Sequence, residues 1–214
     1  MTGCVARQFH NQPERSHQHG YLVDLWNEVR ERSGGALDVA VHPRNGGVEG
    51  SDPEALRMLV AGEIEFATFM GPLLANVHPA AGIQGVPFAF ASSADAHHAI
   101  DGPLGDYLRA ELATKGIYLI PYGALENGMR QICSVAKRVT QLADLEGYRM
   151  RVPDARIIRE LFAELGCEPV TINVDKLGEA LASGRVDGHE NPLAIIDANG
   201  LAPLTRHVAI SNHI

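Results

Sequence analysis

The sequence is poor in cysteine and has no cysteine pattern that would bind a metal or crosslink the chain. Its three cysteines, Cys4, Cys133 and Cys167, are far apart and odd in number, so they form neither a CxxC pair nor a disulfide framework. Burial as small apolar side chains is the simplest interpretation of Cys133 and Cys167. Basic residues are also in the minority, with 18 against 26 acidic residues and a formal net charge of −8. This balance argues against nucleic acid or an anionic membrane as a partner.

Long apolar runs and a secretory leader are absent from the sequence as well. The longest stretch without a charged residue, Phe66 to Ala94, is interrupted by prolines and glycines, and its Asn76 and Gln84 side chains would be stranded in lipid. Residues 1–7 have neither the basic segment nor the apolar segment of a signal peptide. We therefore expect no direct insertion of this chain into a membrane.

The common motifs of cofactor, metal and nucleophile sites are missing too. The glycine-rich loop at 45–50 is not followed by Gly-Lys-Ser/Thr, and the sequence contains no Gly-x-Gly-x-x-Gly loop and no Gly-x-Ser-x-Gly elbow. Histidine is abundant, with ten residues, but none has the His-Glu-x-x-His spacing that presents two ligands on one helical face. Surface positions are favoured for His17, His19, His97 and His98. No metal or cofactor is expected.

The sequence instead contains an alternation of strand and helix patterns, and its 214 residues, 45% of them hydrophobic, can form one large or two small domains. Strands are predicted at 5–10, 37–42, 117–122, 149–152, 170–172 and 186–192. Helices are predicted at 20–34, 52–62, 93–98, 104–113, 157–165 and 175–184, with Asp52 as a helix cap. The pattern predicts an α/β chain with lobes at 1–123 and 124–214. A weak echo between the two halves fits similar lobes or chance equally well.

The stretch from Leu145 to Pro192 organises the second lobe as a strand, a helix, a short strand, a second helix and a third strand. Pro153 ends the first strand, because proline cannot donate to the hydrogen-bond ladder, and this leaves Arg151 at the strand end. The third strand delivers Asn191 to the same kind of position. Ligands of open α/β sheets bind beyond the strand ends, so Arg151 and Asn191 are candidate ligand contacts.

Several motifs in and near this stretch carry a family resemblance. Residues 144–153 read Asp-Leu-Glu-Gly-Tyr-Arg-Met-Arg-Val-Pro, residues 187–194 read Asp-Gly-His-Glu-Asn-Pro-Leu-Ala, and residues 127–130 read Asn-Gly-Met-Arg. From about Phe9 to its last residue, the chain resembles the solute-binding proteins of TRAP (tripartite ATP-independent periplasmic) transporters. One departure inside the motif is His189, where the family usually has Gln.

The resemblance implies a two-lobe, type II periplasmic-binding-protein-like α/β fold with a ligand cleft between the lobes, C-terminally incomplete. It implies a periplasmic protein that closes on a small organic acid and delivers it to membrane permease subunits, without catalysis, cofactor or metal. Family members are exported and continue well beyond residues 211–214, so a processed or incomplete chain is also implied. Such a chain is expected to expose an apolar sheet edge and to associate with itself.

The resemblance assigns the ligand carboxylate to Arg151, Arg130 and Asn191. A guanidinium presents a planar fork of N–H donors that matches a carboxylate, and it keeps its charge at every relevant pH. Asn191 can donate to a carboxylate or accept from a hydroxyl, and a turn residue before Pro192 is the alternative interpretation.

The resemblance also assigns weaker pocket-lining positions, which are Asn11, Asp52, Met70, Asp154 and Val174. Asp154 could accept a hydrogen bond from a ligand hydroxyl and so favour hydroxylated acids. Simpler alternatives exist for three of the five, since Asp52 could be a helix cap, Met70 packing and Val174 plain core.

A function from another class is an enzyme on a similar α/β scaffold that acts on a carboxylate substrate. In that interpretation His189 and Glu190 serve as acid and base beside Arg151. The fate of a co-purified ligand discriminates between the two functions, because a binding protein returns the ligand unchanged after denaturation, whereas an enzyme alters it.

Overall fold

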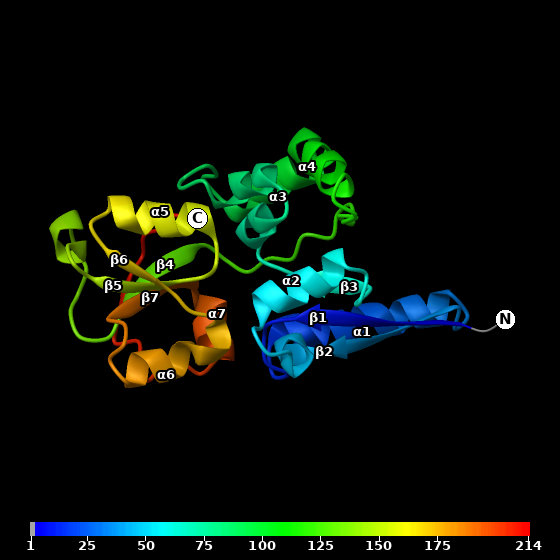
Figure 1. Ribbon diagram of the computed structural model, residues 1–214, viewed down its shortest axis with the longest axis horizontal. Coiled ribbons are helices and arrows are strands. Elements are labelled where there is room, and N and C mark those ends of the chain that lie inside the picture. The colour runs from blue at the N-terminus through cyan, green and yellow to red at the C-terminus, as the bar shows by residue number, and fades with distance from the viewer. Residues whose placement is uncertain (1–2) are drawn as a thin grey trace. The chain divides into compact units, whose positions relative to one another are not determined.

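The computed structural model describes residues 3–214, which divide into two compact units, the first ending at Phe69 and the second running from Met70 to Ile214 (Figure 1). The division places the helices of residues 70–123 with the second unit, where the Asn76 amide donates to the main-chain oxygen of Asp154 at 3.0 Å. The lobe boundary predicted between 123 and 124 is a different division of the chain, and it stays a prediction.

The first unit is a parallel three-stranded sheet in the order β2-β1-β3, formed by β1 (Cys4–His10), β2 (Leu37–His42) and β3 (Phe66–Thr68). Two crossover helices, α1 (His17–Arg32) and α2 (Asp52–Val60), connect these strands in turn. Ala6 packs with Trp26 of α1, whereas Phe9 packs with Ala55 of α2. Because side chains alternate along β1, the two helices cover opposite faces of the sheet.

Asp52 is not the helix cap that the sequence predicts. The residue before it, Ser51, occupies the N-cap position with φ of 53° and makes no capping hydrogen bond with its side chain. Asp52 is the first residue of α2, and its carboxylate accepts hydrogen bonds from Asn11 and Asn45 instead. Pro53 indicated the helix start correctly, but it did not show which residue precedes the helix.

The second unit contains a five-stranded sheet in the order β6-β5-β7-β4-β8. Its strands are β4 (Arg130–Ser134), β5 (Arg149–Val152), β6 (Glu168–Thr171), β7 (Gly188–Pro192) and β8 (His207–Ala209). β5 is parallel to β6 and β7, whereas β4 is antiparallel to β7 and β8. β7 is therefore a central strand with a neighbour on each side.

Two helices connect the parallel strands and cover the two faces of this sheet (Figure 1). α5 (Arg156–Glu164) packs Ile158 and Phe162 against Met150 and Val152 of β5. α6 (Leu177–Ala182) lies on the other face, and its Leu177 packs with Cys133. The predicted order of strand, helix, strand, helix and strand from 149 to 192 is confirmed.

Shorter elements complete the second unit. They are α3 (Ser93–Asp101), α4 (Pro103–Ala113), α7 (Leu193–Ala198) and 3₁₀ turns at Gly71–Asn76, Pro79–Gly85, Leu142–Leu145 and Val174–Lys176. A further 3₁₀ turn in the first unit spans Pro43–Gly47. Among the described residues, no helix combines the length and apolar character needed to cross a bilayer, and the longest, α1, has 16 residues.

The strand predicted at 117–122 is wrong. Residues 117–122 form no strand, Tyr118 is 75% exposed and Tyr122 is 80% exposed with φ of 54°. Apolar composition suggested a strand, but a strand needs a neighbour to bond its main chain, and in the part of the chain described here none pairs with this segment. β8 is an outermost strand of the five-stranded sheet, and Val208 within it and Ile210 just after it are exposed. The self-association expected from the sequence stays a prediction.

Gly188 gives a direct test of the packing around β7. A Cβ at this position would collide with the Cys133 carbonyl oxygen of β4 and come within 2.9 Å of the Tyr148 ring. Gly188→Ala should therefore lower the free energy of unfolding by about 1–3 kcal/mol, as overpacking does. In Gly178→Ala, the matched control, the new Cβ would meet only Leu201 at 3.8 Å, within α6. We expect that variant to unfold at or above the wild-type urea midpoint, and equal losses for both variants would contradict the packing of β7 on β4.

Candidate functional site

The candidate site lies at the edge of the five-stranded sheet where the parallel strands β5 and β7 end. Arg151 lies one residue before the end of β5, Asn191 one residue before the end of β7, and Arg130 at the start of the antiparallel β4. Carboxyl ends of parallel strands and the amino end of an antiparallel neighbour meet at the same edge. Arg130 pairs with Pro192 in the ladder, and Arg151 pairs with His189. The three predicted carboxylate contacts therefore share one edge, with exposed fractions of 6% for Arg130 and 3% each for Arg151 and Asn191.

The strands send these side chains to two faces of the sheet. Arg151 and His189 are register partners, so they project to the same face, and Asn191 joins them because it lies two residues along β7. Glu190 projects to the opposite face, where its register partner Ile132 belongs to the core under α5. Arg130 lies two residues before Ile132 and shares that face.

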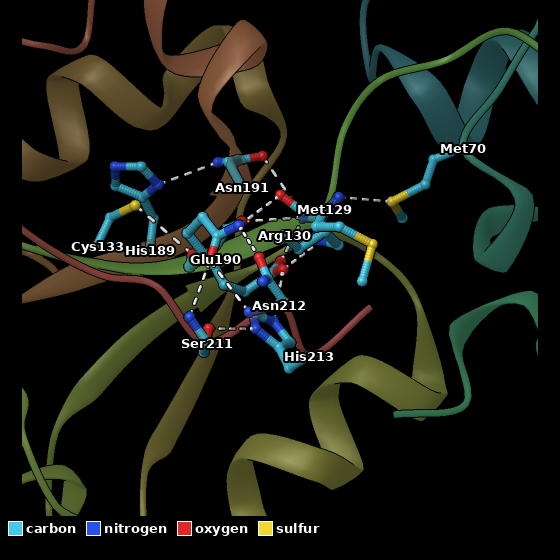
Figure 2. A network of polar contacts seen from close by, with 11 residues as sticks. Met70, Met129, Arg130, Cys133, His189, Glu190, Asn191, Ser211, Asn212 and His213 are labelled. Carbon is cyan, nitrogen blue, oxygen red and sulfur yellow. Dashed lines mark hydrogen bonds and ion pairs between the residues drawn. The ribbon is translucent and has the colours of Figure 1, made fainter. Parts of the chain in front are cut away.

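Arg130 is held by several contacts on that face (Figure 2). Its Nη2 donates to Glu190 Oε1 at 2.6 Å and to the Glu190 main-chain oxygen at 2.9 Å, while its Nε donates to Glu190 Oε2. Its Nη1 lies 3.0 Å from the sulfur of Met70. Nη2 also reaches across the sheet edge to within 3.5 Å of Asn191 Oδ1. The guanidinium is thus fixed in orientation by residues of the chain itself.

Glu190 is fully buried as the partner of Arg130, and this environment sets its ionisation. Burial alone would raise the pKa of Glu190, but the adjacent Arg130 charge, the nearby His213 ring and the hydrogen bonds from Arg130 outweigh it and lower the pKa from 4.5 to about 2. His213 Nε2 lies 3.5 Å from Glu190 Oε2, and its ring stands edge-on to Phe162. Glu190 is therefore a carboxylate at neutral pH.

Arg151 lies on the opposite face from Arg130 and is held there by the residue that follows β6. Its Nε donates to the main-chain oxygen of Ile172 at 2.6 Å, in the residue that follows β6. Its positive charge also acts on the neighbouring His189 ring. Arg151 is thus tied to the ends of β5 and β6, at the place where the sequence predicted a ligand contact.

The placement of His189 and Glu190 does not favour the acid and base of the alternative enzyme. Successive residues of a strand point to opposite faces, and Glu190 is already bound to Arg130. His189 is 1% exposed, and burial, followed by the charge of Arg151, lowers its pKa to about 3. The two groups do not converge on one substrate atom, so the geometry gives no support to that chemistry.

The other predicted positions of the second unit lie near the same edge. Met70 contacts Arg130 through its sulfur. Val174 is buried at the start of the 3₁₀ turn that follows β6. Asp154 is half-buried just after β5, and its carboxylate lies 4.0 Å from the Nη1 of Arg159.

Asn11 and Asp52 belong to the first unit, and they contact each other. Asn11 Nδ2 donates to Asp52 Oδ2 at 2.8 Å, and Asn45 Nδ2 donates to Asp52 Oδ1 at 2.7 Å. Asn45 is fully buried with φ of 51°. Sequence reasoning missed Asn45, although its place in the glycine-rich loop at 45–50 was the available signal, because asparagine tolerates the left-handed region.

A metal site is not seen in the described part of the chain. Across residues 3–214, no group of three or more histidine, cysteine or carboxylate side chains is placed to hold a metal ion. His10 and His19 approach each other at 3.0 Å, and among the described residues no third such side chain joins them in a group that could hold a metal ion.

Comparisons with known proteins identify the family of the chain. The family model of "Bacterial extracellular solute-binding protein, family 7" matches residues 9–214. A "Solute-binding protein" of Verminephrobacter eiseniae is 30% identical over 203 residues, covering 94% of this chain and 59% of the relative. The C4-dicarboxylate-binding periplasmic protein of Rhodobacter capsulatus is 28% identical over 194 residues, covering 88% of this chain and 56% of the relative. The chain thus spans less than two thirds of the length of these relatives.

A solved structure shows the fold. The TRAP periplasmic solute-binding protein from Sulfitobacter sp. NAS-14.1, with bound β-D-galacturonate, superposes with a TM-score of 0.92 at 23% identity, covering 99% of this chain and 69% of that chain. This likeness confirms the predicted α/β fold of the type II periplasmic-binding-protein class. Together with the family match over residues 9–214, it establishes that the chain belongs to family 7 of the bacterial extracellular solute-binding proteins, the TRAP solute-binding proteins that its motifs resemble.

Proposed function

We propose that this protein is the periplasmic solute-binding component of a TRAP-type secondary transporter, which binds a small organic acid and delivers it to membrane permease subunits. The observation that carries the proposal is that Arg151, Arg130 and Asn191 are all buried at one sheet edge, where Arg151 and Asn191 share a face and Arg130 reaches Asn191 at 3.5 Å. Buried N–H donors in this arrangement suit a carboxylate, since each donor can be matched by an anionic oxygen. No covalent chemistry is proposed.

The two arginines have different roles in this proposal. Arg130 is paired with a carboxylate of the chain, Glu190, so its net charge is largely compensated before any ligand arrives. We assign the principal ionic contact to Arg151, whose Nε is fixed by the main-chain oxygen of Ile172 beside the ends of β5 and β6. Arg130 and Asn191 are assigned as oriented donors beside it.

Two relatives support an organic acid as the ligand. One is named as a C4-dicarboxylate-binding protein, and the other was solved with β-D-galacturonate. Both compounds carry a carboxylate and differ in the remainder of the molecule. Asp154, Met70 and Val174, together with Asn11 and Asp52 of the first unit, are proposed as the positions that contact that remainder.

Thermal unfolding with matched ligands tests the ligand class. A ligand at a hundred times its dissociation constant stabilises the native state by about 2.7 kcal/mol, so a bound acid should raise the melting temperature clearly. D-galacturonate and succinate are the acids to measure, and neutral D-galactose is the control. A shift with galactose and none with either acid would remove the carboxylate from the proposal.

Substitution of Arg151 tests the principal contact. Removing one partner of a buried charge pair costs roughly 2–5 kcal/mol, and about 1.4 kcal/mol corresponds to one decade in affinity. Arg151→Ala should therefore weaken acid binding by about thirty-fold to a few thousand-fold, measured by calorimetry, and Arg151→Lys should fall between Ala and wild type.

The matched control for this experiment is Arg156→Ala. Arg156 pairs with Glu160 on the outside of α5, and its side chain is 76% exposed, so affinity and melting temperature should stay near wild type. Circular dichroism must show that Arg151→Ala remains folded. Wild-type affinity in Arg151→Ala, with binding abolished in Arg130→Ala, would reverse the assigned roles.

Glu190→Gln tests the buried ion pair through stability. The pKa of Glu190 is lowered from 4.5 to about 2 in the folded protein, so this carboxylate stabilises the fold fully above pH 4.5 and loses that contribution as pH falls from 4.5 to 2. At neutral pH the variant leaves Arg130 without its buried partner and should lose about 3–5 kcal/mol. Denaturant unfolding of both proteins from pH 7 to pH 2 should show the difference shrinking with acid. A constant difference would contradict the pairing.

A further inference from the structure

His189 lies between two hydrogen-bonding partners at the sheet edge. Its Nδ1 is 3.1 Å from Asn191 Nδ2, and its Nε2 is 3.0 Å from the Thr205 hydroxyl. Asn191 in turn places its Oδ1 3.5 Å from Nη2 of Arg130. Figure 2 shows Asn191 between His189 and Arg130. A continuous polar chain therefore runs from Thr205 through the ring and the amide to the guanidinium.

The contact with Arg130 determines the donor and the acceptor in every hydrogen bond of this series from Thr205 to Arg130. A guanidinium only donates, so the Asn191 atom that faces it must be the amide oxygen. The amide nitrogen then faces His189, and because an amide nitrogen only donates, Nδ1 of the ring must accept. The ring proton consequently lies on Nε2, which donates to the Thr205 hydroxyl.

A neutral ring is required for this arrangement, and the surroundings of His189 provide it. Burial, and after it the charge of Arg151, lowers the pKa of His189 to about 3, so the ring carries one proton at physiological pH. A protonated ring would turn an N–H at Nδ1 against the N–H of Asn191.

Thr205 is held in place by main-chain contacts. Its amide N–H donates to the carbonyl oxygens of Leu201 at 3.0 Å and Ala202 at 3.2 Å. The next residue, Arg206, donates from its main chain to Ser134 of β4 at 3.1 Å. The acceptor for the ring proton is thus fixed by the loop before β8.

We propose that His189 is a positioning residue of the ligand site, which holds the Asn191 amide with its oxygen toward Arg130 and one N–H left to donate to the ligand carboxylate. Among the described contacts, the ring nitrogen takes one of the two hydrogens on Asn191 Nδ2. A flipped amide would present its oxygen to the ligand in place of that N–H and repel an anion. The inference rests on the proposed function, and it adds the His189 ring as the group that sets the orientation of the Asn191 amide.

Two substitutions at His189 separate polarity from bulk, with D-galacturonate as the probe. His189→Leu removes the acceptor and should weaken binding by about ten-fold, which corresponds to about 1.4 kcal/mol. His189→Gln can supply an oxygen to accept from Asn191 and an N–H to donate to Thr205, so its affinity should stay within about three-fold of wild type. A glutamine variant as weak as the leucine variant would overturn the proposal.

Thr205→Val changes the same series of hydrogen bonds without altering a residue assigned to contact the ligand. It removes the acceptor for the ring proton, so the other tautomer becomes accessible and binding should weaken several-fold. The loss should not add to that of His189→Leu, because both changes release the same amide. Thr114→Val is the matched control, since that hydroxyl bonds the Glu111 carbonyl at the exposed end of α4, and it should bind as wild type.

A measurement on the unliganded 214-residue chain completes the test. Nitrogen-15 NMR of the imidazole should show a neutral His189 ring protonated on Nε2 at pH 7, and Thr205→Val should shift it toward the other tautomer. A ring protonated on Nδ1 or on both nitrogens overturns the inference, whether or not any acid binds. If Arg151→Ala weakens D-galacturonate binding while His189→Leu and Thr205→Val bind as wild type, the proposed function stands and the positioning role fails.

Discussion

The alternation of side chains along β7 is the constraint on which the candidate site depends. β7 is the central strand, all five of its residues are buried, and it is bonded to β5 on one side and β4 on the other. A slip of one residue would exchange the faces of Glu190 and Asn191. The carboxylate would then leave Arg130, and the amide would leave the face of Arg151. Packing of Gly188 beneath the Cys133 carbonyl opposes such a slip, because a residue with a side chain does not fit there.

The buried ion pair between Arg130 and Glu190 explains how the guanidinium of Arg130 can be almost fully buried without a bound ligand. An uncompensated charge is expensive away from water, and the Glu190 carboxylate offsets that cost while it also fixes the orientation of the fork. Compared with apolar side chains of similar volume, a buried ion pair adds little net stability, although removing one partner alone is strongly destabilising. In the proposed function the pair contributes orientation, because a donor that is immobile before the ligand arrives loses little entropy on binding.

Much of this fold could be predicted from the sequence, because the signals were local. Pro153 at a strand end, Gly166 and Gly184 after two helices and the apolar spacing of Ile158 and Phe162 all act within a few residues of the chain. Both glycines have positive φ, which accounts for the helix ends. The position of Arg151 at the sheet edge followed from the same local pattern.

The features that could not be predicted depend on which strands become neighbours. Glu190 meets Arg130 only because β4 pairs antiparallel with β7, sixty positions away in sequence. The apolar segment 117–122 had the composition of a strand and lacked a partner among the described strands. His189 stands where the family motif usually has glutamine. The sequence did not show that its ring contacts Thr205, because Thr205 comes from a loop after α7.

A site with buried N–H donors discriminates between ligands by how many of those donors each ligand leaves without a hydrogen bond. Buried donors lose their hydrogen bonds to water, so a ligand without acceptors at their positions leaves them unsatisfied at a cost comparable to a lost hydrogen bond each. Arg130 and Asn191 already spend part of their hydrogen-bonding capacity on Glu190 and His189. In the proposed function only the remaining donors contact the ligand, and the chain sets their directions before a ligand enters. Under that proposal, selectivity for a carboxylate is a property of the polar network around the arginines as much as of the arginines themselves.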